Sequence, residues 1–142
     1  MGVSKSKAVV LSTAQTLTTS LAVIGSPGTF DVRNNESITL EVTYAKGTDT
    51  SCTIVVEGSI DPTAGSPVWL PAEPAADVSG SLSAGVFTTP MGYRKRSFDT
   101  SGTYPVHVDC GAFHRLRIRA LATAGGVPDG TLAVRAAGVQ ES

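Results

Sequence analysis

Hydrophobic and polar side chains alternate along residues 37–61, SITLEVTYAKGTDTSCTIVVEGSID. The apolar positions of the first half share one phase: Ile38, Leu40, Val42 and Tyr44. Those of the second half also share one phase: Cys52, Ile54, Val56 and Ile60. Because successive side chains of a strand point to opposite faces, this period predicts two strands that each bury one face. We expect them to form a β-hairpin around the polar turn at residues 46–50.

Shorter alternating runs flank this segment. Upstream, residues 13–25 predict a strand with Leu17, Leu21 and Val23 inward, and residues 29–34 predict another. Downstream, three further runs place these residues inward: Val106 and Val108; Leu116, Ile118 and Ala120; Leu132 and Val134. Gly, Pro and Asn separate the runs, as expected of turns. About eight strands without a long helix predict an all-β antiparallel sandwich, for which a jelly roll is the natural form.

The length of 142 residues fits one domain. Residues 1–12 predict a polar, lightly basic arm, and residues 13–142 predict a single sandwich domain. Within that domain, residues 72–103 have no sustained period and predict a long irregular excursion with one short strand at 85–89. Long loops in compact domains are generally functional or ordered by a partner.

The composition and the net charge exclude some classes of function. Charged residues are only 16% of the chain and the net charge is −1, which argues against non-specific binding to nucleic acid. A lightly charged surface rich in small residues indicates that partners cover part of it. The chain has no run of about 20 apolar residues and no continuous apolar signal-peptide core, so we expect no membrane span and synthesis in the cytoplasm without export.

The sequence offers little for catalysis. His107 falls on an outer phase and His114 on the phase of Leu116, and no GxSxG, P-loop or GxGxxG motif is present. Glu57 and Asp61 share one strand face and are interpreted as exposed solubilising charges. We therefore expect no enzymatic activity, no catalytic residue and no small-molecule substrate.

The two cysteines give no evidence of a metal site or a cofactor. Cys52 and Cys110 lie on inward phases, which predicts buried free thiols; a disulfide between them stays open, because the sequence does not give their separation. No CxxC or Cys/His cluster with zinc-ligand spacing occurs, so no metal ligands are predicted.

Basic residues give the sharpest signal. The segment Tyr93-Arg94-Lys95-Arg96 is a compact cationic island, and the 115–119 strand carries a row of arginines on its outer face. Arginine pairs bidentately with carboxylates, which favours a protein partner, although a solvated face is the alternative. With the arm lysines, the candidate partner-binding residues are Lys5, Lys7, Tyr93, Arg94, Lys95, Arg96, Arg115, Arg117 and Arg119.

Carbohydrate binding is a further function that β-sandwich domains serve. Such sites usually present several exposed aromatic rings, and this chain has one Trp and three Tyr. Trp69 lies in the proline-bounded run PVWLPAEP, which predicts a short edge strand, and its ring is interpreted as a core plug.

Two segments carry a resemblance to known proteins: FDVRNNESITLEVTYAKGTDTSCTIVVEGSIDPTAGSPVWLP and FHRLRIRALATAGGVPDGTLAVRAAG. Together they resemble small bacteriophage virion proteins, in which alternating strands, a polar turn, a Gly-Ser-hydrophobic-Asp ending and a tryptophan follow one another. One departure is that Pro62, and not Gly, follows Asp61, which puts the conformation of that loop in doubt.

The resemblance implies a non-enzymatic virion component, most plausibly a jelly-roll capsid decoration or cement protein on the outer capsid surface. Its implied partners are the major capsid protein and copies of itself, as dimers or trimers, without nucleic acid, membrane or small molecule. Two alternatives stay open. One is a head–tail connector, tail or fibre component of the virion, and the other is a carbohydrate-binding β-sandwich module.

Overall fold

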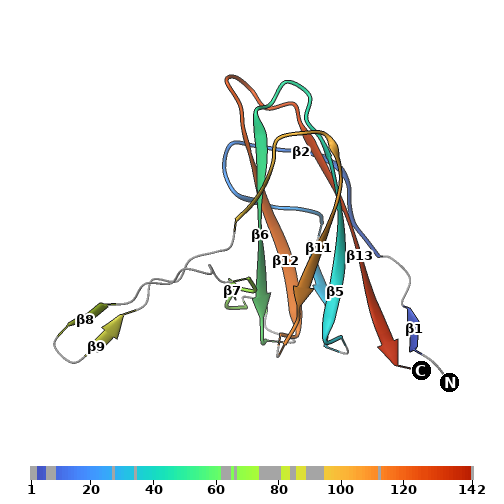
Figure 1. Cartoon of the computed structure of the whole chain (residues 1–142), viewed down its shortest axis with the longest axis vertical. Helices are drawn as coiled ribbons and strands as arrows, with labels where there is room; N and C mark the ends of the chain where they lie inside the picture. The colour runs from blue at the N-terminus through green and yellow to red at the C-terminus, as the bar shows by residue number, and fades with distance from the viewer. Residues whose placement is uncertain are drawn as a thin grey trace.

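The computed structural model describes residues 3–5, 9–26, 28–33, 35–61, 65, 67–73, 81–83, 86–88, 95–111 and 113–141. Within these ranges the regular structure is all β, arranged as two larger antiparallel sheets and one separate pair of strands (Figure 1). The predicted all-β antiparallel sandwich is confirmed. The jelly-roll form of that sandwich stays a prediction.

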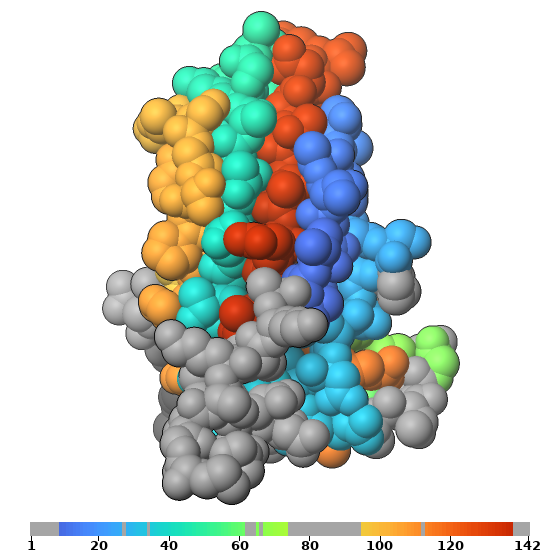
Figure 2. All heavy atoms as spheres, turned by 90° about the vertical axis from the view of Figure 1, so that its right-hand side faces the viewer, coloured from blue at the N-terminus to red at the C-terminus, as the bar shows by residue number. Residues whose placement is uncertain are grey.

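Sheet one has β13 and β5 at its centre. The strand β5 pairs with β11 on its other side, while β1 and β2 follow one another along the outer edge of β13. The bounds are β1 Val3–Lys5, β2 Val9–Thr16, β5 Ser37–Ala45, β11 Gly102–Asp109 and β13 Thr131–Glu141. Figure 2 shows the outer face of this sheet, with β11 in gold, β5 in teal, β13 in red and β2 in blue.

Sheet two is built on β6 and β12. Short strands complete both edges: β10 and β7 pair along β6, and β3 and β4 pair along β12. The bounds are β3 Ala22–Val23, β4 Thr29–Asp31, β6 Ser51–Ser59, β7 Leu70–Pro71, β10 Arg96–Phe98 and β12 Arg115–Thr123. The remaining strands, β8 Ser81–Ser83 and β9 Val86–Thr88, pair with each other.

The predicted hairpin at residues 37–61 is wrong in its pairing. Both strands exist as β5 and β6, but β5 pairs with β11 and β13, while β6 pairs with β12, β10 and β7. The turn at 46–50 therefore crosses from sheet one to sheet two, which lie about 10 Å apart in a sandwich. Alternation shows which face of a strand is buried, and it does not show which strand lies beside it.

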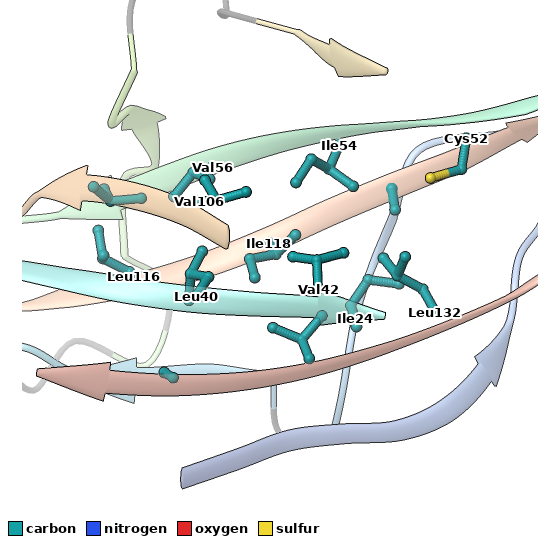
Figure 3. Packing of buried hydrophobic residues seen from close by; sticks show 14 of the residues in the cluster. Ile24, Leu40, Val42, Cys52, Ile54, Val56, Val106, Leu116, Ile118 and Leu132 are labelled. Atoms are coloured by element: carbon teal, nitrogen blue, oxygen red, sulfur yellow. The ribbon is translucent and has the colours of Figure 1, made fainter. Parts of the chain in front are cut away.

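The core lies between the two sheets (Figure 3). The inward phases predicted for β5, β11, β12 and β13 are confirmed, since Leu40, Val42, Val106 and Leu116 are buried with their neighbours of the same phase. Cys52 and Cys110 are buried free thiols, as predicted. Ile60 is the exception: it is 57% exposed, because β6 ends at Ser59 and the inward alternation stops there.

The N-terminal and excursion segments contribute strands. Residues 9–12, predicted as part of the arm, belong to β2, so the proposed boundary falls inside a paired strand. Within residues 13–25, the buried side chains are Leu17 and Ile24, whereas Leu21 and Val23 are only partly buried. Within 72–103, β9 agrees with the strand predicted at 85–89, and β8 and β10 are additional strands.

Candidate interaction surface

A buried carboxylate organises the outward face of sheet two. Glu57 on β6 lies opposite Arg117 on β12, and its side chain is 2% exposed. Arg117 Nε donates to Glu57 Oε1 at 2.8 Å, and Arg119 Nη1 lies 3.7 Å from Oε2. The prediction of Glu57 as an exposed solubilising charge is therefore wrong. The long arginine side chains of the neighbouring strand cover it, and a buried charge requires such partners.

The indole of Trp69 covers the arginine that holds Glu57. The Arg117 guanidinium carbon lies 4.3 Å from the centre of the Trp69 ring, in cation–π geometry. The prediction that the Trp69 ring fills the core is wrong, because the side chain falls on the outward phase of its strand. Leu70 pairs with Gly58, which is on the inward phase of β6, so the preceding Trp69 falls on the outward phase.

Exposed apolar side chains lie on the neighbouring residues of the same sheet edge. Ile60 is 57% exposed, Val68 is 66% exposed and Leu70 is 37% exposed. The β6–β7 register, extended by two pairs, places Ile60 opposite Val68 on the phase of Gly58 and Leu70, which is the phase opposite to that of Trp69. A grouped apolar surface with a polar rim is typical of protein–protein contact sites. We call this edge of sheet two the Trp69 surface: Trp69 and Arg117 lie on its outward phase, and Ile60, Val68 and Leu70 lie on the opposite phase.

Two contacts fix the backbone beneath the Trp69 surface. Phe113 packs over Gly58, where a Cβ atom would come within 2.6 Å of the ring. Arg115 Nε donates to the Asp61 carbonyl oxygen at 2.9 Å, and the Asp61 carboxylate accepts a hydrogen bond from Val68 N at 3.3 Å. Asp61, the residue before Pro62, is thereby tied to β12 and to the segment that precedes β7.

The structure brings together one part of the predicted partner-binding set. Arg115, Arg117 and Arg119 share the outward face of β12, as predicted, and lie at or beside the Trp69 surface. Arg96 lies on the other side of β6, where its guanidinium forms an ion pair with Glu73. Lys95 is exposed.

The other predicted partner-binding residues cannot be placed at this surface. Lys5 lies in β1, at the edge of sheet one, and nothing is described of its side chain. Lys7, Tyr93 and Arg94 lie outside the described residues.

Sequence reasoning missed the apolar half of the Trp69 surface. The alternation predicts Ile60 in the core, and the flanking prolines predict only an edge strand for Val68 and Leu70. A signal was present in Pro67 and Pro71, which confine the strand to an edge and so leave its flanking apolar side chains without a covering neighbour.

The histidines and the thiols form no reactive arrangement among the residues described. His107 is exposed, with Nδ1 2.9 Å from Thr39 Oγ1. Burial raises the pKa of both Cys52 and Cys110 to about 11, so each thiol stays protonated near neutral pH. In the same ranges, no group of three or more His, Cys, Asp or Glu side chains could hold a metal ion, and no helix could span a membrane.

Comparison with known proteins gives a match in fold. No family model matches the chain, and no curated protein matches it in sequence. Among solved structures, the SPBc2 prophage-derived protein YomS superimposes with a TM-score of 0.54 at 13% identity, over 99% of this chain and 96% of that one. The two chains share a fold over nearly their whole lengths.

Proposed function

We propose that this chain is a non-enzymatic phage virion protein, most plausibly a capsid decoration or cement protein that binds the major capsid protein lattice from outside. The observation that carries the proposal is the Trp69 surface, an edge of sheet two with exposed apolar side chains on one phase and, on the other, an arginine held by Trp69 and a buried carboxylate. Trp and Arg are enriched at the energetic centres of protein interfaces. The prophage origin of a protein with the same fold supports the virion setting.

The charge of the molecule also supports a protein partner. Arg117 and Arg119 share the Glu57 carboxylate, which offsets part of the positive charge of this face, and the whole chain has a net charge of −1, which disfavours nucleic acid. Arg117 already occupies one face of the Trp69 ring, which leaves that face unable to stack on a sugar. A carbohydrate-binding module is thus less well supported than a protein-binding one.

The test is sedimentation of purified protein with empty capsids of the phage that encodes it. We expect the wild-type protein to sediment with the capsids, and the double variant Ile60→Ser/Val68→Ser to lose most of that binding. Val10→Ser is the matched control, because Val10 is 58% exposed but lies on β2 of sheet one. A wild-type protein that stays in the supernatant would exclude the cement role.

The number of copies of the protein in each virion distinguishes a capsid location from the alternative location in a connector, tail or fibre. Cement proteins follow the icosahedral lattice, whereas connector and tail proteins form rings around one axis. Quantitative mass spectrometry of virions is expected to find hundreds of copies, and about six or twelve copies would instead favour a ring.

A further inference from the structure

We propose that copies of this chain join to one another by strand addition, in which the β8–β9 hairpin of one copy pairs along the open edge of β2 in the next copy. The contact is separate from the Trp69 surface and does not depend on the proposed function. It joins two features that the sandwich leaves incomplete in the part of the chain described, a hairpin without a third strand and a sheet edge without a neighbour.

The β8–β9 hairpin pairs with neither of the two large sheets in the part of the chain described. Its register has three pairs: Ser81 with Thr88, Leu82 with Phe87 and Ser83 with Val86. In Figure 1 it lies to the left of the sandwich, beyond β7. A two-stranded hairpin is at best marginally stable in water, and a third strand or a packed face is needed to hold it. The hairpin therefore needs a partner that its own sandwich does not supply.

The sequence of the hairpin suits addition to another sheet. Residues 79–89, SGSLSAGVFTT, contain no charged residue, so no charge has to be desolvated on docking. Seven residues separate Glu73 from Ser81, and six separate Thr88 from Lys95. A connection of six residues spans at most about 20 Å, which lets the hairpin reach a neighbouring molecule.

The open edge of β2 lies on the opposite side of the sandwich. β2 pairs with β13, and no described strand pairs along its other edge, so it is the last strand of sheet one in Figure 2. Its sequence, VVLSTAQT, has no charge and no proline. Val9 is 56% exposed and Val10 is 58% exposed, and since successive side chains point to opposite faces, neither face is covered at this end of the strand. An unpaired edge of this kind is a template for a strand of another chain.

The other sheet edges are less suited to pairing. β11, at the far edge of sheet one, carries Pro105, which has no N–H to donate, and the exposed Asp109. Sheet two ends on both sides in strands of two or three residues. Proline, charge and short length are the devices by which edge strands avoid pairing with other chains. β2 has eight residues and neither proline nor charge, so we assign the contact to it.

A groove runs beside β2 and gives the hairpin a place to lie. It has a volume of about 490 Å³ and is lined by residues 10–15 of β2 and by residues 25–26 of the β3–β4 turn. The Gln15 side chain joins the two walls: its Nε2 donates to Val23 O at 3.2 Å, and its Oε1 accepts from Gly25 N at 2.9 Å. A groove whose walls are already fixed loses little entropy when a strand binds.

The positions of hairpin and groove commit the occupant to a second copy. The sandwich lies between them in Figure 1, so the two features meet between molecules and not within one. Because different surfaces of the two copies take part, the contact is head to tail, and such contacts close into a ring when the rotation between copies allows it. Main-chain hydrogen bonds supply the affinity in this mode of recognition.

The first experiment is oxidative cross-linking of variants that each carry one added cysteine. Ser83→Cys in β8 is mixed with Thr13→Cys in β2 and, as the matched control, with His107→Cys in β11; Thr13 and His107 are both exposed. The native Cys52 and Cys110 are buried and add no cross-link. Non-reducing electrophoresis should show a dimer in the Ser83→Cys/Thr13→Cys mixture, and no more dimer in the control mixture than each variant forms alone.

The second experiment removes the hairpin. Residues 79–89 are replaced by a Gly-Ser linker, and both proteins are studied by analytical ultracentrifugation at high protein concentration. We expect the wild type to form an oligomer and the deletion variant to be a monomer. Urea unfolding should be unchanged by the deletion, because the hairpin pairs with neither large sheet. Val10→Ser keeps the backbone donors and acceptors of β2 and is expected to retain the oligomer.

The outcomes distinguish this inference from the proposed function. A wild-type protein that stays monomeric, a deletion variant that keeps the oligomer, or cross-linking to β11 as strong as to β2 overturns the inference. None of these results bears on whether the protein sediments with capsids. An oligomer that depends on the hairpin supports the inference even if the protein does not bind capsids.

Discussion

Arg117 lies between Glu57 and Trp69, with a hydrogen bond of 2.8 Å to the carboxylate and a distance of 4.3 Å from its guanidinium carbon to the centre of the indole ring. Two strands, β6 and β12, and the residue that precedes β7 supply the groups. The arginine therefore joins the central pair of sheet two to its edge. It also holds the aromatic ring of Trp69 on the outward face of the sheet.

Removal of the Glu57 side chain should destabilise the fold. The Glu57→Ala variant leaves Arg117 and Arg119 without their carboxylate on a largely covered face, and losing one partner of a buried ion pair costs about 3 kcal/mol. Urea denaturation measures the change in the free energy of unfolding. Glu41→Ala is the matched control, because Glu41 pairs with Arg135 in the open and should change stability by about 0.5 kcal/mol or less. Equal losses from both variants would contradict the assigned role of Glu57.

A methyl group at Gly58 should force Phe113 out of its position. In Gly58→Ala the new Cβ would lie within 2.6 Å of the ring, and such overpacking costs about 1–3 kcal/mol. Gly125→Ala is the control, since nothing lies within 4 Å of its Cβ position. If Gly58→Ala unfolds at the same urea concentration as wild type, the packing of Phe113 on Gly58 is wrong.

Acid should weaken the hydrogen bonds that join the β5–β6 turn to the β12–β13 turn, in which the Asp129 carboxylate accepts from Thr48 and the Asp49 carboxylate accepts from Asp129 N and Gly130 N. Hydrogen bonds from Thr48, above all from its backbone N–H, hold the pKa of Asp129 below its ordinary value of 3.8. A carboxyl group whose pKa is lower in the folded state contributes stability that is fully present above the unfolded pKa and is lost as pH falls through the folded one. The free energy of unfolding should therefore decline as pH drops below 3.8.

The Asp129→Asn variant tests this assignment. Its stability should be lower than that of wild type near neutral pH and should fall less steeply in acid. Asp31 also has a lowered pKa, because of its hydrogen bonds with Arg33, so some acid dependence should remain in the variant. Wild-type and variant curves with the same slope in acid would show that Asp129 contributes nothing to it.

The two thiols should be inert in the folded protein. Cys52 and Cys110 are buried, and burial raises the pKa of each to about 11, so the reactive thiolate is scarce and inaccessible at mildly alkaline pH. Mass spectrometry after iodoacetamide treatment should find both unlabelled in buffer and both labelled in denaturant. Rapid labelling of either cysteine in buffer would mean that its strand opens locally.

The sequence predicted the burial phase of the long strands well, because period-two alternation records the exposure of each side chain directly. It did not predict which strands pair with one another. Glu41 and Arg135 face each other across β5 and β13 although they are 94 positions apart, and no local pattern encodes that distance.

The candidate surface was predicted only in part, for a related reason. The arginine row of β12 follows from its own alternation and was found. The burial of Glu57 depends on side chains from β12 and from the segment before β7, which are remote in sequence. The local pattern, a charged residue on an outward phase, therefore predicts exposure. The position of Trp69 depended in the same way on its register against β6.

The crossing of the 46–50 turn between the sheets has a consequence for the order in which the chain can fold during synthesis. β5 is made early, yet its partners are β11 and β13, and β13 also carries β1 and β2. Sheet one therefore cannot be completed during synthesis until β13 has emerged from the ribosome. Until then, the strands that pair with β13 have unpaired edges. Pairing over such sequence separations is slow, and the waiting strands are open to association with other chains. We expect deletion of β13 to yield aggregated protein, since β1, β2 and one edge of β5 would then have nothing to pair with.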